Sequence, residues 1–102
     1  MPPQERLEPQ VRRDQILAAA LSLAKTHGYT NITRKQITEK AGCSPRLLNY
    51  YYTTMPQLRR DVMRAAIDQK VLKVIAQGLT AKDPHALKVS DELKALAAAT
   101  LT

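Results

Sequence analysis

Residues 33–52 read TRKQITEKAGCSPRLLNYYY, and they carry the clearest structural signals in the chain. Thr33 and Gln36 have the spacing of a capping box, in which each side chain bonds a backbone N–H at the other position. A capping box satisfies donors that the first turn of a helix leaves free. The spacing therefore predicts a short helix over residues 34–41.

A second short helix follows after a tight turn. Gly42 and Cys43 form that turn, because glycine readily takes the left-handed conformation that ends a helix. Ser44 can then cap the next helix, Pro45 suits its first position, and it is expected to run to about Tyr52. Two short helices joined in this way have the form of a helix-turn-helix, whose second helix is offered to the DNA major groove.

The faces of that second helix follow from a rotation of about 100° per residue. Leu48 and Tyr52 share one side, which we expect to point inward, while Arg46 and Tyr50 lie opposite, in solvent. The outward groups suit DNA. An arginine fits the two acceptors of guanine, an amide such as Asn49 fits adenine, and a tyrosine hydroxyl more often bonds phosphate.

Helical spacing of apolar residues continues on both sides of this stretch, and no run alternates like a strand. A first helix is predicted over about 11–27. A long fourth helix is predicted from a second capping box at Thr54 to about Gly78, and a short C-terminal helix starts at Pro84, where Ser90 could restart it. The predicted fold class is all-α: a three-helix helix-turn-helix domain, a long fourth helix and a short C-terminal helix.

Composition narrows the function. The chain has 102 residues, 16 Lys+Arg against 9 Asp+Glu, one cysteine and two histidines. This is the size of one domain, with no intramolecular disulfide and a poor zinc set. Ten basic and four acidic residues precede position 61, against six and five from there on. Such an imbalance favours a polyanionic partner for the front half, and the short apolar runs predict no membrane span.

The stretch from Arg13 to Leu58 resembles the DNA-binding domain of the tetracycline-repressor (TetR) family. The resemblance rests on an Ile-Leu-x-x-Ala helix, Gly28-Tyr29, Thr33 before Ile37, Ala41-Gly42-Cys43-Ser44, Leu48 before Tyr50 and Tyr52, and Leu58. In that family the start of the second helix and the outward face of the third contact DNA. By matching positions this implies contacts from Arg34, Lys35, Ser44, Pro45, Arg46, Leu47, Asn49, Tyr50 and Tyr51.

Two departures from the family pattern bear on base preference. A tyrosine is common after the position of Leu48, where this chain has Asn49, and a lysine is common at the head of the fourth helix, where it has Met55. The family's usual ligand-binding and dimerisation domain is expected to be absent, which leaves residues 58–102. No small-molecule inducer is therefore expected, and the sequence shows no cofactor, metal or catalytic motif.

These observations predict a flexible arm over residues 1–10, a helix-turn-helix DNA-binding domain over 11–57 and a helical dimerisation region over 58–102. The predicted protein is a repressor in the bacterial cytoplasm or nucleoid. It would bind a palindromic double-stranded DNA operator as a homodimer. The operator would belong to its own operon or to an operon of a plasmid or phage. Two alternatives stay open: a DNA-binding protein for partition, replication or architecture, and a helical module that binds an acidic protein.

Overall fold

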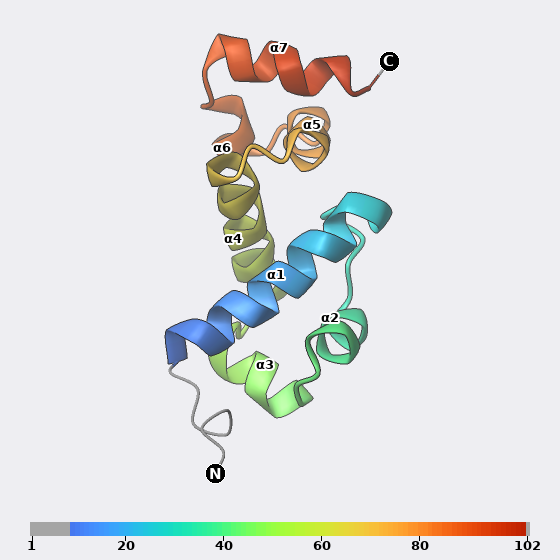
Figure 1. The fold of residues 1–102 in the computed structure, drawn as a ribbon, viewed down its shortest axis with the longest axis vertical. Coiled ribbons are helices and arrows are strands. Elements are labelled where there is room, and N and C mark those ends of the chain that lie inside the picture. Colours follow the sequence, from blue (N-terminus) through green and yellow to red (C-terminus); the bar gives the residue numbers. More distant parts are fainter. Residues whose placement is uncertain (1–8, 102) are drawn as a thin grey trace.

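The computed structural model describes residues 9–101, and these residues form helices joined by short turns, with no strand among them (Figure 1). The predicted all-α fold class is confirmed. The helices are α1 (Pro9–His27), α2 (Arg34–Ala41), α3 (Pro45–Tyr51), α4 (Met55–Asp68), α5 (Leu72–Thr80), α6 (Pro84–Leu87) and α7 (Asp91–Ala99).

The local signals around α2 and α3 act as expected. The Thr33 side chain accepts from the backbone N–H of Gln36, and the Gln36 side chain accepts from that of Thr33, at 3.2 and 3.0 Å. Gly42 ends α2 with a φ of 70°, in the left-handed region that favours glycine. The Ser44 hydroxyl accepts from the N–H of Leu47, and Pro45 begins α3. These turns fix α2 and α3 as a helix-turn-helix.

One hydrophobic core runs through the described chain. In its lower part α1, α2, α3 and the start of α4 pack on one another. In its upper part α5 and α6 pack on the far end of α4, and α7 packs on α5 (Figure 1). The largest fully buried side chains are those of Tyr52, Ile16, Ile37, Leu48, Leu58, Met63, Ile75, Val62 and Val74. Helix α4 therefore joins the helix-turn-helix to the C-terminal helices.

The predicted long fourth helix is wrong, because the chain turns between α4 and α5. Lys70 has a φ of 55°, and the N–H of Val71 bonds the carbonyl of Ala66 while that of Lys70 bonds the carbonyl of Ile67. This pair of bonds is a Schellman motif, which usually places glycine where Lys70 stands. The turn lets Val74 and Ile75 face the core from a new direction, and a helix-period pattern cannot reveal a turn without its glycine.

The predicted single C-terminal helix is likewise two helices. Asp83 caps α6, and Ser90 caps α7 through the N–H of Leu93, so the restart at Ser90 does occur. Gly78 lies inside α5 rather than at a helix end. A Cβ built on Gly78 would come within 2.5 Å of the Met63 methyl and 2.8 Å of the Ala86 Cβ, so glycine lets three helices approach closely here.

The predicted domain limits fall inside helices. α1 already begins at Pro9, so residues 9–10 are not part of an arm, and residues 1–8 of the predicted arm lie outside the described residues. The predicted boundary at 57/58 lies within α4, whose buried Leu58 and Val62 belong to the shared core.

Two side chains tie the helix-turn-helix part to the C-terminal helices. The Gln77 side chain on α5 accepts from the N–H of Tyr29 and donates to the carbonyl of Ala24, both at 2.9 Å. The Tyr29 hydroxyl donates to Asp83 Oδ2 at 3.1 Å, and burial first, then the charge of Asp83, raises the pKa of Tyr29 to about 12. The loop after α1 is thus held against α5 and α6.

Candidate nucleic-acid interface

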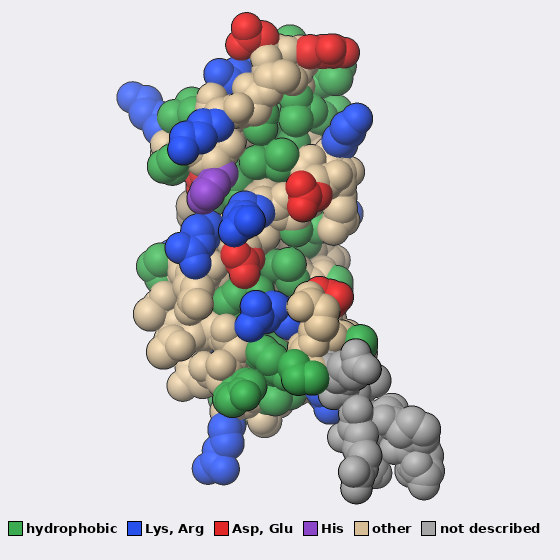
Figure 2. All heavy atoms as spheres, turned by 90° about the vertical axis from the view of Figure 1, so that its left-hand side faces the viewer, with side chains coloured by type: hydrophobic (Ala, Val, Ile, Leu, Met, Phe, Trp, Pro, Cys, Tyr) green, Lys and Arg blue, Asp and Glu red, His purple; other side chains and the backbone are tan. Residues whose placement is uncertain are grey.

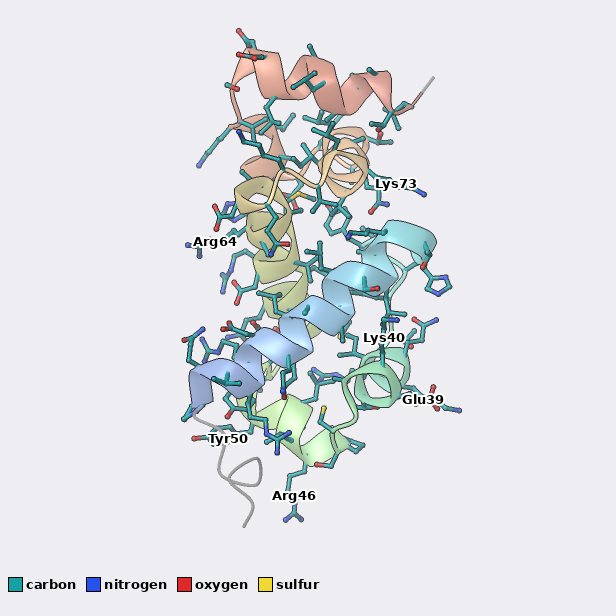
Figure 3. All side chains as sticks on the ribbon, viewed as in Figure 1. Glu39, Lys40, Arg46, Tyr50, Arg64 and Lys73 are labelled. Atoms are coloured by element: carbon teal, nitrogen blue, oxygen red, sulfur yellow. The ribbon has the colours of Figure 1, made fainter. Side chains whose placement is uncertain are left out.

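Helix α3 presents opposite faces to the core and to solvent, as its sequence predicts. Leu48 is 0% and Tyr52 1% exposed, whereas Tyr50 is 76% exposed and Arg46 is exposed as well. In Figure 3 Arg46 projects from the lower end of the molecule, away from every other helix, and Tyr50 also lies at that end. The molecule is 48 Å long, and α3 occupies the end opposite α7 (Figure 1).

Tyr52 anchors the end of α3 to α4. Its ring is buried, and its hydroxyl donates to Asp61 Oδ2 at 2.9 Å. Burial, followed by the hydrogen bond to Asp61, raises the pKa of Tyr52 above its ordinary value. The neutral hydroxyl is therefore favoured, and it holds the C-terminus of α3 against the middle of the domain.

Arg34, at the first position of α2, reaches across to α3. Its Nη1 donates to Asn49 Oδ1 at 2.9 Å and to the carbonyl of Tyr52 at 3.3 Å, and its Nη2 donates to the carbonyl of Thr53 at 2.9 Å. Both carbonyls belong to the C-terminal end of α3, where a cation is favourable. The guanidinium is thus occupied inside the protein. Arg34 and Asn49 were each predicted to contact DNA, and the structure brings them together.

The remaining residues predicted to contact DNA differ in how exposed their side chains are and in whether they are hydrogen-bonded. Lys35 is exposed at the start of α2, and Pro45 is exposed at the first turn of α3. The Ser44 oxygen accepts the capping bond, which leaves its O–H proton to donate. Leu47 is half-buried, so only part of its side chain can reach a partner.

The two neighbouring tyrosines form an aromatic group with an arginine of α1. Tyr50 and Tyr51 meet edge to face with ring centroids 5.0 Å apart. The guanidinium carbon of Arg13 lies 5.7 Å from the Tyr51 ring centroid and 5.9 Å from that of Tyr52, within reach of a cation–π interaction. Tyr51 is half-buried, and its ring is in contact with both Arg13 and Tyr50.

Sequence reasoning missed three of these relationships. Arg13, Asp61 and the inward role of Arg34 all depend on contacts between helices, since the paired residues are 9 to 39 positions apart. The run of tyrosines at 50–52 drew attention to the end of α3, but it did not indicate which residues the tyrosines would contact.

Charge is mixed over most of the surface. On the face shown in Figure 2, basic and acidic side chains both lie over the upper and middle parts, and a basic side chain projects from the lower end. Within residues 9–101 no three His, Cys, Asp or Glu side chains lie close enough to hold a metal ion. In the same part of the chain, no helix combines the length and the apolar character that crossing a membrane requires.

Comparison with known proteins gives one match. Residues 16–62 match the family model described as bacterial regulatory proteins, tetR family. The matched segment spans most of α1, all of α2 and α3, and the first half of α4. Neither the curated proteins nor the solved structures gave a significant match to the chain.

Proposed function

Residues 16–62 form a DNA-binding domain of the tetR family of bacterial regulatory proteins, and from that premise we propose that the protein is a transcriptional repressor. A homodimer binds a two-fold symmetric operator, and each subunit places α3 in the major groove of one half-site. The bound dimer covers a promoter and excludes polymerase. The family is one of DNA-binding regulators rather than enzymes, and family members typically dimerise.

The outward face of α3 is the observation that carries the proposal. Arg46 and Tyr50 stand free at one end of a 48 Å molecule, on a helix whose other face is locked by Leu48 and Tyr52. A helix held so firmly can enter a groove about 12 Å wide without changing its own position. Lys35, exposed at the head of α2, stands beside it to meet phosphate.

The opposite end of the molecule supports the dimer. Among the described residues, three of the five large hydrophobic side chains that remain exposed lie between positions 87 and 101: Leu87, Leu96 and Leu101. Exposed apolar side chains gathered in one region favour contact with another protein surface. A two-fold axis makes such a contact self-complementary, so one region on each copy suffices.

The dimensions limit how two copies can be arranged. An end-to-end dimer would point its two α3 helices in opposite directions, so the copies must stand side by side with both α3 ends on DNA. Each molecule is 22 by 20 Å across. Half-sites one helical turn apart need α3 helices separated by about 34 Å. The two long axes must therefore diverge from the C-terminal helices toward the DNA.

Selection of duplexes from a random pool, combined with light scattering, tests both parts of the proposal. We expect a two-fold symmetric consensus and a mass of twice 11.4 kDa. Leu96→Lys should give the monomer mass and select a single half-site. Val11→Lys, which also replaces an exposed apolar side chain but on α1, should keep the mass of the dimer.

Repression needs its own measurement. The selected site, placed over a promoter in a purified transcription reaction, should lower transcript yield, and the same site placed well upstream should not. Equal transcription from both templates would support a partition, replication or architectural role. Absence of DNA binding, with no fall in log K as log salt rises, would favour a protein-interaction module instead.

A further inference from the structure

The contact between Arg34 and Asn49 points to a specific base preference. We propose that Arg34 positions the Asn49 amide so that it offers only its NH2 group to the groove, and that Asn49 therefore selects guanine rather than adenine. This inference rests on the proposed function, because it concerns how α3 reads its half-site. It makes Asn49 a specificity-determining residue and Arg34 a positioning residue.

The first step is the orientation of the amide. Arg34 Nη1 donates to Asn49 Oδ1 at 2.9 Å, so the oxygen is identified by its donor. The carbonyl and the NH2 group diverge from one planar carbon. An oxygen that turns toward α2 therefore turns the NH2 group away from it. Asn49 is exposed, and no described residue accepts a hydrogen bond from its Nδ2.

The second step is that Arg34 is itself fixed. Its guanidinium also bonds the carbonyls of Tyr52 and Thr53, at 3.3 and 2.9 Å. These carbonyls lie at the end of α3, so the arginine moves with the helix that carries Asn49. Swinging Arg34 away to free the Asn49 oxygen would break bonds at the helix end as well. The amide orientation is thus built in before DNA arrives.

The third step is the match to base edges in the major groove. Adenine presents an acceptor at N7 and a donor at N6, and an asparagine reads both only if its oxygen and its NH2 group face the base together. Arg34 uses one of the two lone pairs of this oxygen, and under the proposal that bond also turns the carbonyl toward α2, so that the oxygen and the NH2 group do not face the base together. Guanine presents two acceptors, N7 and O6, and an NH2 group carries two protons. The outward amide therefore complements guanine and leaves the N6 donor of adenine without an acceptor.

The experiment is duplex selection followed by affinity measurement for the full chain, three single variants and one double variant. The half-site position read by Asn49 is the one whose preference Asn49→Ala removes. At that position the unaltered protein should favour guanine over adenine by roughly 5- to 100-fold, and Asn49→Ala should bring the ratio close to one. Arg34→Met frees the oxygen and should move the preference to adenine.

Asn49→Asp keeps every bond of Arg34 and replaces only the outward NH2 group by an oxygen. It should move the preference from guanine to cytosine, whose N4 group donates. This variant decides the question even if Arg34→Met fails to fold. Arg34→Met in the Asn49→Ala background should leave the base ratio at that position unchanged, which a general loosening of α3 would not do.

The outcomes are separable. A guanine preference that moves as described supports the inference. A clear two-fold consensus with adenine at the Asn49 position, or one that no Asn49 variant alters, overturns the inference and leaves the proposed function standing. A consensus that is the same for Arg34→Met and the unaltered protein overturns the role of Arg34. An unaltered protein that selects no sequence overturns the proposed function, and this inference with it.

Discussion

Truncation of Leu48 to alanine should remove a large part of the free energy of unfolding of the domain. Leu48 is the one fully buried residue among the seven of α3. Tyr52, which caps the helix, is buried as well. The change removes three carbon groups, worth about 0.8 kcal/mol each on transfer from water, or about 2.4 kcal/mol. The cavity left in the core adds to this, and the expected loss is about 3–4 kcal/mol.

A loss of that size is large for one domain of this length, whose total free energy of unfolding is of the order of 5–15 kcal/mol. Urea unfolding followed by circular dichroism measures it. With a slope of about 1–3 kcal/mol per molar, the midpoint should fall by about 1–4 M. All variants are compared at one protein concentration, because dimerisation would stabilise the folded state by mass action.

Tyr50→Ala is the matched control on the same helix. Its side chain is 76% exposed and its ring meets that of Tyr51 edge to face, so its loss should cost less than about 1 kcal/mol. DNA affinity should show the reverse pattern: when both variants are measured under conditions where they are folded, Tyr50→Ala should bind DNA more weakly than Leu48→Ala. If Tyr50→Ala destabilised the fold as much as Leu48→Ala, the assignment of the two faces of α3 would be refuted, and the proposed interface with it.

Three further predictions concern DNA contacts and pH. Arg46→Ala should weaken the selected site by about 1–3 kcal/mol and relax base choice at one position, measured by competition between duplexes. Lys35→Ala should weaken binding to all sequences alike and lower the slope of log K against log salt by about 1. Lys73→Ala on α5 is the control and should leave the slope unchanged. An unchanged slope for Lys35→Ala would contradict its phosphate contact. Because the folded protein holds the pKa of Tyr29 at about 12 against 10 when unfolded, its contribution to stability is complete below pH 10 and is lost as pH rises from 10 to 12. Tyr29→Phe should make that decline shallower, and an identical decline would argue against the bond to Asp83.

The sequence alone was enough to predict the helix-turn-helix. Its signals are local: the capping box at Thr33 and Gln36, the left-handed Gly42, and Ser44 before Pro45 each act within about four residues. The faces of α3 followed from helix geometry, because apolar side chains four apart in a helix must share a side. Their burial in the structure agrees with that prediction.

The turn between α4 and α5 could not be predicted from local signals, because its conformational cost is offset by contacts between residues that are distant in the sequence. Lys70 adopts a conformation that usually costs a non-glycine residue about 1–2 kcal/mol. Burial of Val74 and Ile75 against α4, and the bonds from Gln77 back to α1, offset that cost. The spacing of apolar residues along one helix does not indicate such contacts.

Hydrogen bonds and side-chain periodicity within one helix set which segments coil and which side of α3 turns outward, so both could be inferred from the order of the residues. The bonds that the outward groups make with one another depend on how the helices pack. Arg34 and Asn49 are 15 positions apart and both look like free DNA contacts in the sequence. Packing of α2 against α3 joins them, so the Asn49 oxygen already accepts from Arg34, which the sequence could not reveal.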